Sequence, residues 1–137
     1  MILTSNFQTH EFLVSKDYPE LAKAMMFTYN DTLILKLICE SILQPVRDKF
    51  GRVEILSGKR SLKLNKAVKG HKDSMHLNCC AVDFTVKDIS QLPDIFKFII
   101  HHCDYRTVIY YREKNFIHID INIPGVSYRK YTEIKGG

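Results

Sequence analysis

The chain has 137 residues, of which 45% are hydrophobic and 26% charged, and its formal net charge is +5. These values exclude a disordered or low-complexity chain and predict a single globular domain over residues 1–137. The basic residues are scattered, so the charge permits an anionic partner without indicating nucleic acid. No apolar run approaches the roughly 20 residues needed to span a membrane.

The N-terminal segment MILTSNFQTHEF has no basic region followed by an apolar stretch, so we expect no signal peptide and synthesis in the cytoplasm. The four cysteines lack the short, even spacing of a disulfide-stapled protein, and we interpret them as reduced. The adjacent Cys79 and Cys80 could serve as soft metal ligands, but burial is the commoner reason for a cysteine.

A long amphipathic helix is the first strong element, because apolar residues recur at three- and four-residue steps from Asp31 onward. Asp31 could cap its start. Pro45 should kink the helix or weaken its last turn, and Gly51 supplies a stop after Phe50.

The rest of the chain alternates between strand-like and helical patterns. After the long helix these patterns predict strands at Arg52–Leu56 and Cys80–Val86, and helices at Ser61–Val68 and Ser90–Cys103. They also predict a hairpin formed by Arg106–Tyr111 and Phe116–Ile123. Helices come first and an antiparallel sheet comes late. We therefore expect an α+β fold in which N-terminal helices pack on a small, mainly antiparallel sheet.

Asp83 is the first candidate for a functional side chain, because it interrupts an apolar strand pattern. Alternation along CCAVDFTV puts Asp83 on the more polar face of that strand. In FIHIDI, alternation likewise puts His118 and Asp120 on one face and isoleucines on the other. A pattern of this kind is by itself typical of an exposed polar stripe, so the interpretation depends on a third residue.

His76 supplies that residue, because it precedes Asp83 by seven positions in a short loop that enters the strand. The loop can fold the imidazole back over the carboxylate. Two histidines and one aspartate, with water in the fourth position, form the open arrangement of catalytic zinc, whereas structural zinc sites are closed by Cys and His ligands. The sequence therefore predicts one zinc ion per chain, held by His76, Asp83 and His118.

The pattern Ser74-x-His76-x6-Asp83 resembles the S-x-H-x-x-G-x-A-x-D signature of the D-Ala-D-Ala carboxypeptidase and phage endolysin family of zinc peptidases. The segments LTSNFQTHEF, ILQPVRDKFG, SGKRS, LNKAVKG and NFIHID follow the order seen in its small phage and bacterial members, so the resemblance covers nearly the whole chain. The superfamily also contains the VanX-type dipeptidases and the Hedgehog signalling domain. The resemblance implies a Hedgehog-like fold with a zinc cleft.

The same resemblance implies a function and further site residues. The expected activity is hydrolysis of amide bonds in peptidoglycan stem or cross-bridge peptides, by a D-Ala-D-Ala carboxypeptidase or a murein endopeptidase. Arg60, in SGKRS, matches an arginine that helps to hold the substrate's carboxylate, and Ser74 is expected to line the same pocket. The planar guanidinium of Arg60 can bind a carboxylate in two places, although an ordinary surface arginine is the alternative.

Two positions depart from the family pattern. Cys79 stands where the signature has glycine, which affects the geometry of the loop. Asn115 stands where several relatives have an acid three residues before the last histidine ligand. Asp120 is then the nearest candidate for the general base, with Glu113 as second choice. Asp120 could instead accept a hydrogen bond from a ligand histidine and orient its ring.

Two other functions stay open from the sequence. A zinc-binding domain without hydrolysis, as in the Hedgehog signalling domain, would explain the missing acid and a similar YY-x-x-K hairpin. A wall-binding or virion-associated module would fit the basic charge but not the metal pattern.

We expect a monomer that acts on peptidoglycan peptides, at the cell wall if it is released or carried by a phage particle. Neither nucleic acid nor membrane is an expected partner. We assign no role to the other histidines considered, His10, His71, His101 and His102.

Overall fold

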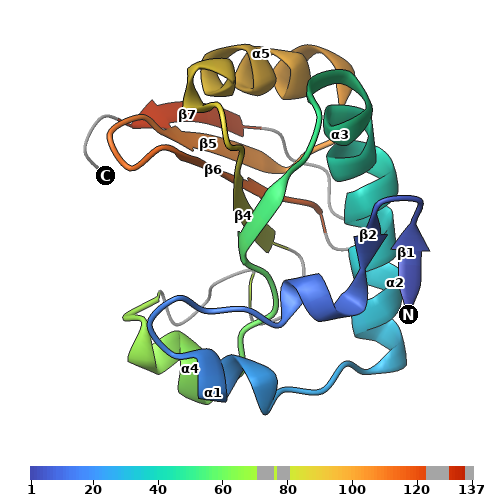
Figure 1. Ribbon diagram of the computed structural model, residues 1–137, viewed down its shortest axis with the longest axis vertical. Helices are drawn as coiled ribbons and strands as arrows, with labels where there is room; N and C mark the ends of the chain where they lie inside the picture. The colour runs from blue at the N-terminus through green and yellow to red at the C-terminus, as the bar shows by residue number, and fades with distance from the viewer. Residues whose placement is uncertain (71–75, 77–80, 123–129, 135–137) are drawn as a thin grey trace.

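The computed structural model describes residues 1–70, 76, 81–122 and 130–134 (Figure 1). Within these residues the elements run in the order β1 (Ile2–Thr4), β2 (Phe7–Gln8), α1 (Pro19–Lys23), α2 (Tyr29–Ile38), α3 (Gln44–Phe50), β3 (Glu54–Ser57), α4 (Leu62–Ala67), β4 (Ala81–Thr85), α5 (Leu92–His102), β5 (Thr107–Tyr111), β6 (Phe116–Asp120) and β7 (Lys130–Ile134). The expected α+β class is confirmed.

In the described part of the chain, the main sheet has five strands in the order β3-β4-β6-β5-β7. Its pairs are antiparallel except for β5 and β7, which run parallel, so the prediction of a mainly antiparallel sheet is confirmed. The predicted hairpin is β5–β6, and Asn115 in its turn has φ +58°. Asparagine tolerates this left-handed conformation better than most residues, which gives Asn115 a structural reason to be there.

One face of the sheet carries the core. Ile117 and Ile119 of β6 are fully buried there, as alternation in FIHIDI predicts. Helices α2, α3 and α5 contribute the apolar side chains that meet this face, and Figure 1 shows α5 lying along the sheet. His118 lies between the two isoleucines in sequence and therefore belongs to the opposite face.

The long helix is longer at its start and less regular than predicted. It begins at Tyr29, where the Thr28 hydroxyl accepts from the Asp31 N–H and the Asp31 carboxylate accepts from the Thr28 N–H. A π-helical turn over Cys39–Leu43 separates α2 from α3. Pro45 explains this turn, because proline lacks an N–H and its ring clashes with the preceding turn of a regular α-helix.

The segment after β3 packs against the N-terminal part of the chain, and the Lys59 N–H donates to the carbonyl oxygen of Phe12 at 3.1 Å. Strand β3 begins at Glu54 rather than Arg52, because its partner β4 ends at Thr85, the residue opposite Glu54. A Cβ atom at Gly58 would lie 2.6 Å from the carbonyl oxygen of Phe12, so only glycine fits this approach. This close approach lies two residues before Arg60.

None of the described helices combines the length and the apolar character that crossing a membrane requires.

Candidate metal centre

Asp83 and His118 are direct neighbours across two strands. Asp83 of β4 lies opposite His118 of β6 in the antiparallel register, on the face of the sheet away from the core. Side chains of directly opposed residues lie close enough to touch. The Nδ1 atom of His118 lies 2.8 Å from Oδ1 of Asp83. The sheet itself therefore brings two of the three predicted ligands together.

His76 joins this pair through contacts with the segment that follows β3. Its Nδ1 lies 2.7 Å from the carbonyl oxygen of Gly58, and its own carbonyl accepts the N–H of Arg60 at 2.9 Å. A carbonyl only accepts, so Nδ1 must carry a hydrogen, and Nε2 is the ring nitrogen left to face the cluster. That Nε2 lies 3.4 Å from Oδ1 of Asp83. The ring of His76 is buried and approaches the ring of His118 edge to face.

The ring of His118 is held from its other side. Its Nε2 lies 2.7 Å from Oδ2 of Asp120, which is buried. With the Nε2 N–H donating to this carboxylate, Nδ1 is the ring nitrogen that faces Asp83 and that a metal ion could take after it loses its hydrogen. Of the two roles considered for Asp120, this contact favours orientation of His118.

The three side chains together fit a zinc ion. The donor atoms that His76, Asp83 and His118 offer all lie within 4.8 Å of one another. Two imidazole nitrogens and one carboxylate oxygen are a donor set that zinc accepts in catalytic sites with an open position. Hydrogen bonds to Gly58 and Asp120 fix which nitrogen of each ring is available, as is usual for metal-binding histidines.

Asp83 and His118 have strongly shifted pKa values. Burial raises the pKa of Asp83, but hydrogen bonds from His118 and His76 outweigh burial and hold that pKa well below its usual range. Burial lowers the pKa of His118, but hydrogen bonds to Asp120 and Asp83 outweigh it and raise the pKa to about 9. Without metal, His118 is therefore a cation at neutral pH, hydrogen-bonded to two carboxylates.

A pH dependence of zinc binding follows from this raised pKa. Zinc needs the lone pair of Nδ1, so its binding displaces a proton from His118 at any pH below about 9. We expect the apparent zinc affinity to rise about tenfold per pH unit from neutral pH and to level off above the pKa of His118. Competition with a chelator of known affinity across this range measures it. A flat profile would contradict the protonated state.

Arg60 lies at the edge of the cluster and is not an ordinary surface arginine. Its side chain is 15% exposed, and its Nη2 lies 3.7 Å from Oδ2 of Asp83. Its Nε donates to the hydroxyl of Ser57 at 3.3 Å and its Nη1 donates to Oδ1 of Asn65 at 3.2 Å. The guanidinium is therefore fixed on one side of the metal cluster. Ser57 and Asn65 fall within the segments SGKRS and LNKAVKG that carry the family resemblance, but no role was assigned to either from the sequence.

The remaining candidate residues lie partly inside and partly outside the described part of the chain. Glu113 is exposed in the β5–β6 turn. Ser74 and Cys79 lie outside the described residues, so the predictions for them stay predictions. His101 and His102 are exposed at the end of α5.

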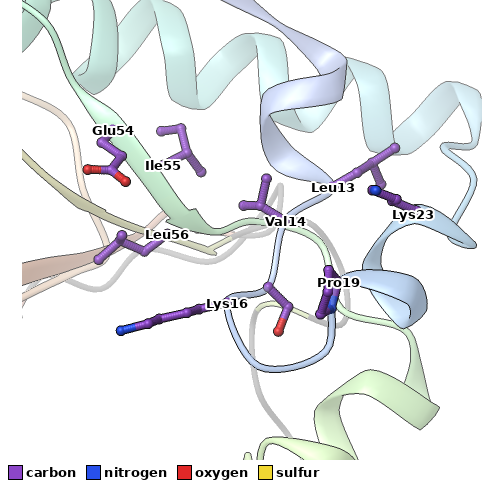
Figure 2. Close-up of a pocket in the computed structure, with 9 residues that line it drawn as sticks. Leu13, Val14, Lys16, Pro19, Lys23, Glu54, Ile55 and Leu56 are labelled. Atoms are coloured by element: carbon purple, nitrogen blue, oxygen red, sulfur yellow. The ribbon is translucent and has the colours of Figure 1, made fainter.

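Two hollows on the surface are distinct from the metal cluster. A groove of about 390 Å³ runs beside the edge strand β3, where Figure 2 shows side chains of the N-terminal segment next to those of Glu54, Ile55 and Leu56. A second hollow of about 350 Å³ lies between α3 and α5. Neither is lined by His76, Asp83 or His118, so the chemistry is assigned to the cluster and not to these hollows.

The fold and the donor set together describe a zinc peptidase type of centre. The model of the peptidase M15 family matches residues 5–120, which is most of the chain and includes all three candidate ligands. The chain belongs to this family of zinc metallopeptidases. A comparison with curated proteins found no match.

Proposed function

We propose that this zinc metallopeptidase hydrolyses amide bonds in peptidoglycan stem or cross-bridge peptides, as a D-Ala-D-Ala carboxypeptidase or as a murein endopeptidase of the endolysin type. The observation that carries the proposal is the convergence of His76, Asp83 and His118, with the fixed guanidinium of Arg60 beside them. Such an arrangement pairs a hydrolytic centre with a group that binds peptide carboxylates. The positive net charge also suits an anionic cell-wall polymer.

The proposed ligand atoms are Nε2 of His76, a carboxylate oxygen of Asp83 and Nδ1 of His118. Zinc bound there supplies Lewis-acid chemistry, which activates water and polarises a carbonyl group. The chain's own residues do the positioning. Gly58 and Asp120 fix the two imidazole rings, and Arg60 supplies the cation next to Asp83 that would orient the substrate's carboxylate.

Arg60→Lys is expected to keep the fold and the zinc ion but to lower kcat/KM for carboxylate-bearing peptides by about tenfold or more. Lysine is a compact point charge, and it cannot reproduce the planar fork held between Ser57 and Asn65. Steady-state kinetics on a defined peptide measure the effect. The matched control is Arg52→Lys, because Arg52 is exposed. Equal kcat/KM values for both variants would contradict a role of Arg60 in substrate binding.

Non-catalytic zinc binding is the second candidate function, and one observation favours it. Both oxygens of Asp120 have partners, Arg106 for Oδ1 and His118 for Oδ2. The side chain of Asn115 is not acidic, and Glu113 is exposed in the turn. Under this alternative the centre would bind zinc and peptide without turnover.

Digestion of purified murein sacculi separates the two candidates. The zinc-loaded protein is incubated with sacculi, and the released products are identified by mass. Loss of a single terminal D-Ala indicates a carboxypeptidase, and release of cross-bridge or stem fragments indicates an endopeptidase. Binding of sacculi with no new products, under conditions where zinc is stoichiometric, would contradict the proposed hydrolysis and support the non-catalytic alternative.

A further inference from the structure

We propose that Arg106 is a positioning residue of the metal centre, which acts through Asp120 to hold the ring of His118 with Nδ1 facing the metal. The proposal rests on the zinc site proposed above and adds a residue outside the ligand set. Arg106 has no place in any motif of the sequence. It lies just before β5, the strand next to the one that carries His118.

The first support is the way Asp120 divides its two oxygens. Oδ1 lies 3.1 Å from Nη1 of Arg106, and Oδ2 lies 2.7 Å from Nε2 of His118. The backbone N–H of Arg106 also donates to the carbonyl oxygen of Asp120 at 2.8 Å. The carboxylate therefore forms a bridge from Arg106 to the ring of a proposed metal ligand.

The second support is the burial of Asp120, which is only 3% exposed. A buried carboxylate without a compensating cation is strongly disfavoured. Arg106 supplies a permanent positive charge and fixes Oδ1, so Oδ2 is left pointing at the ring of His118. A carboxylate held in this way accepts the Nε2 hydrogen and keeps the ring in one tautomer and one orientation.

The third support is that Arg106 is itself held in place. Its Nη1 also lies 3.2 Å from the hydroxyl oxygen of Thr107, which faces Asp120 across the β5–β6 pair. Yet the side chain of Arg106 is 33% exposed. Shortening it therefore opens no closed cavity in the core. Removing its charge takes a cation from the buried Asp120, so thermal unfolding of each variant is measured before zinc is titrated.

The test compares zinc affinity in Arg106→Gln and in the unmutated full chain, by chelator competition at fixed pH. We expect affinity to fall about tenfold, at the lower end of the effect of removing a group that supports a metal ligand. Arg106→Lys should retain affinity within about threefold, because the contact with Asp120 uses a single nitrogen that an ammonium group can replace.

The matched control is Arg112→Gln. Arg112 forms a similar 3.1 Å contact with Glu133, but at an exposed position away from the ligands, so its loss should leave zinc affinity unchanged. Nitrogen-15 spectra of the histidine rings give a second readout. In the zinc-loaded unmutated protein His118 should show a hydrogen on Nε2 alone, and in metal-free Arg106→Gln its signals should broaden or shift.

Unchanged zinc affinity in Arg106→Gln, or an equal loss in Arg112→Gln, would overturn the proposal. Loss in Arg106→Gln together with retention in Arg106→Lys would support it, because a purely steric role would not depend on charge. The assay uses zinc and no peptide. The result for Arg106 therefore does not depend on whether the protein hydrolyses peptides.

Discussion

Replacing His76, Asp83 or His118 with alanine is expected to weaken zinc binding by more than about a hundredfold, since even removal of a supporting group costs up to that amount. Each residue provides one of three donor atoms that lie within 4.8 Å of one another. A site with three protein ligands keeps little affinity when one is lost. Metal analysis of the purified variants and chelator competition measure the loss. Peptide hydrolysis should disappear with the zinc.

His101→Ala is the control for these variants. His101 is exposed near the end of α5, on an element that packs against the core face of the sheet. Its removal should leave stoichiometric zinc. Stoichiometric zinc in any one of the three ligand variants would contradict the assignment of that residue, and loss of zinc in His101→Ala would show that the ligand set is incomplete.

Asp120→Asn is expected to lower zinc affinity about ten- to a hundredfold, while activity at saturating zinc survives. The amide keeps the shape of the carboxylate but not its charge. It cannot accept from His118 and from Arg106 with two equivalent oxygens, so the ring of His118 loses its fixed orientation. Zinc titration followed by kinetics on the zinc-saturated variant separates affinity from turnover.

The alternative role of Asp120 as general base predicts the reverse result. Zinc would be retained, and the rate at saturation would fall by about a hundredfold or more, the usual scale for loss of a general base. Glu113→Gln is the paired variant, because Glu113 is the second candidate for the base. Asp104→Asn, at an exposed acid before β5, controls for the loss of one negative charge.

Local patterns predicted those parts of the fold that local physics determines. The helix around Leu35 and the β5–β6 hairpin have strong periodicity and clear turn residues, and the structure confirms both. The π-helical turn before Pro45 was not predicted, because it depends on how the helix accommodates the proline against its packing partners. Strand β7 was also missed, because its parallel pairing with β5 is a contact between distant segments.

For the metal ligands too, the sequence predicted the local features of the site but not the contacts between distant segments. Alternation placed Asp83 and His118 on polar faces of their strands, and this did not require the structure. Their direct opposition depends on the register of β4 and β6, which no local pattern specifies. The contact of His76 with Gly58 uses a backbone carbonyl, and the contact of Asp120 with Arg106 joins unrelated segments. Neither has a sequence signature.

A crystal structure of the zinc-loaded protein tests the central claim most directly. We predict one zinc ion per chain, about 2.0–2.2 Å from Nε2 of His76, an oxygen of Asp83 and Nδ1 of His118. The Nε2 atom of His118 should remain hydrogen-bonded to Asp120. A zinc ion bound elsewhere, or bound through Nε2 of His118 with Asp120 displaced, would contradict the proposed centre.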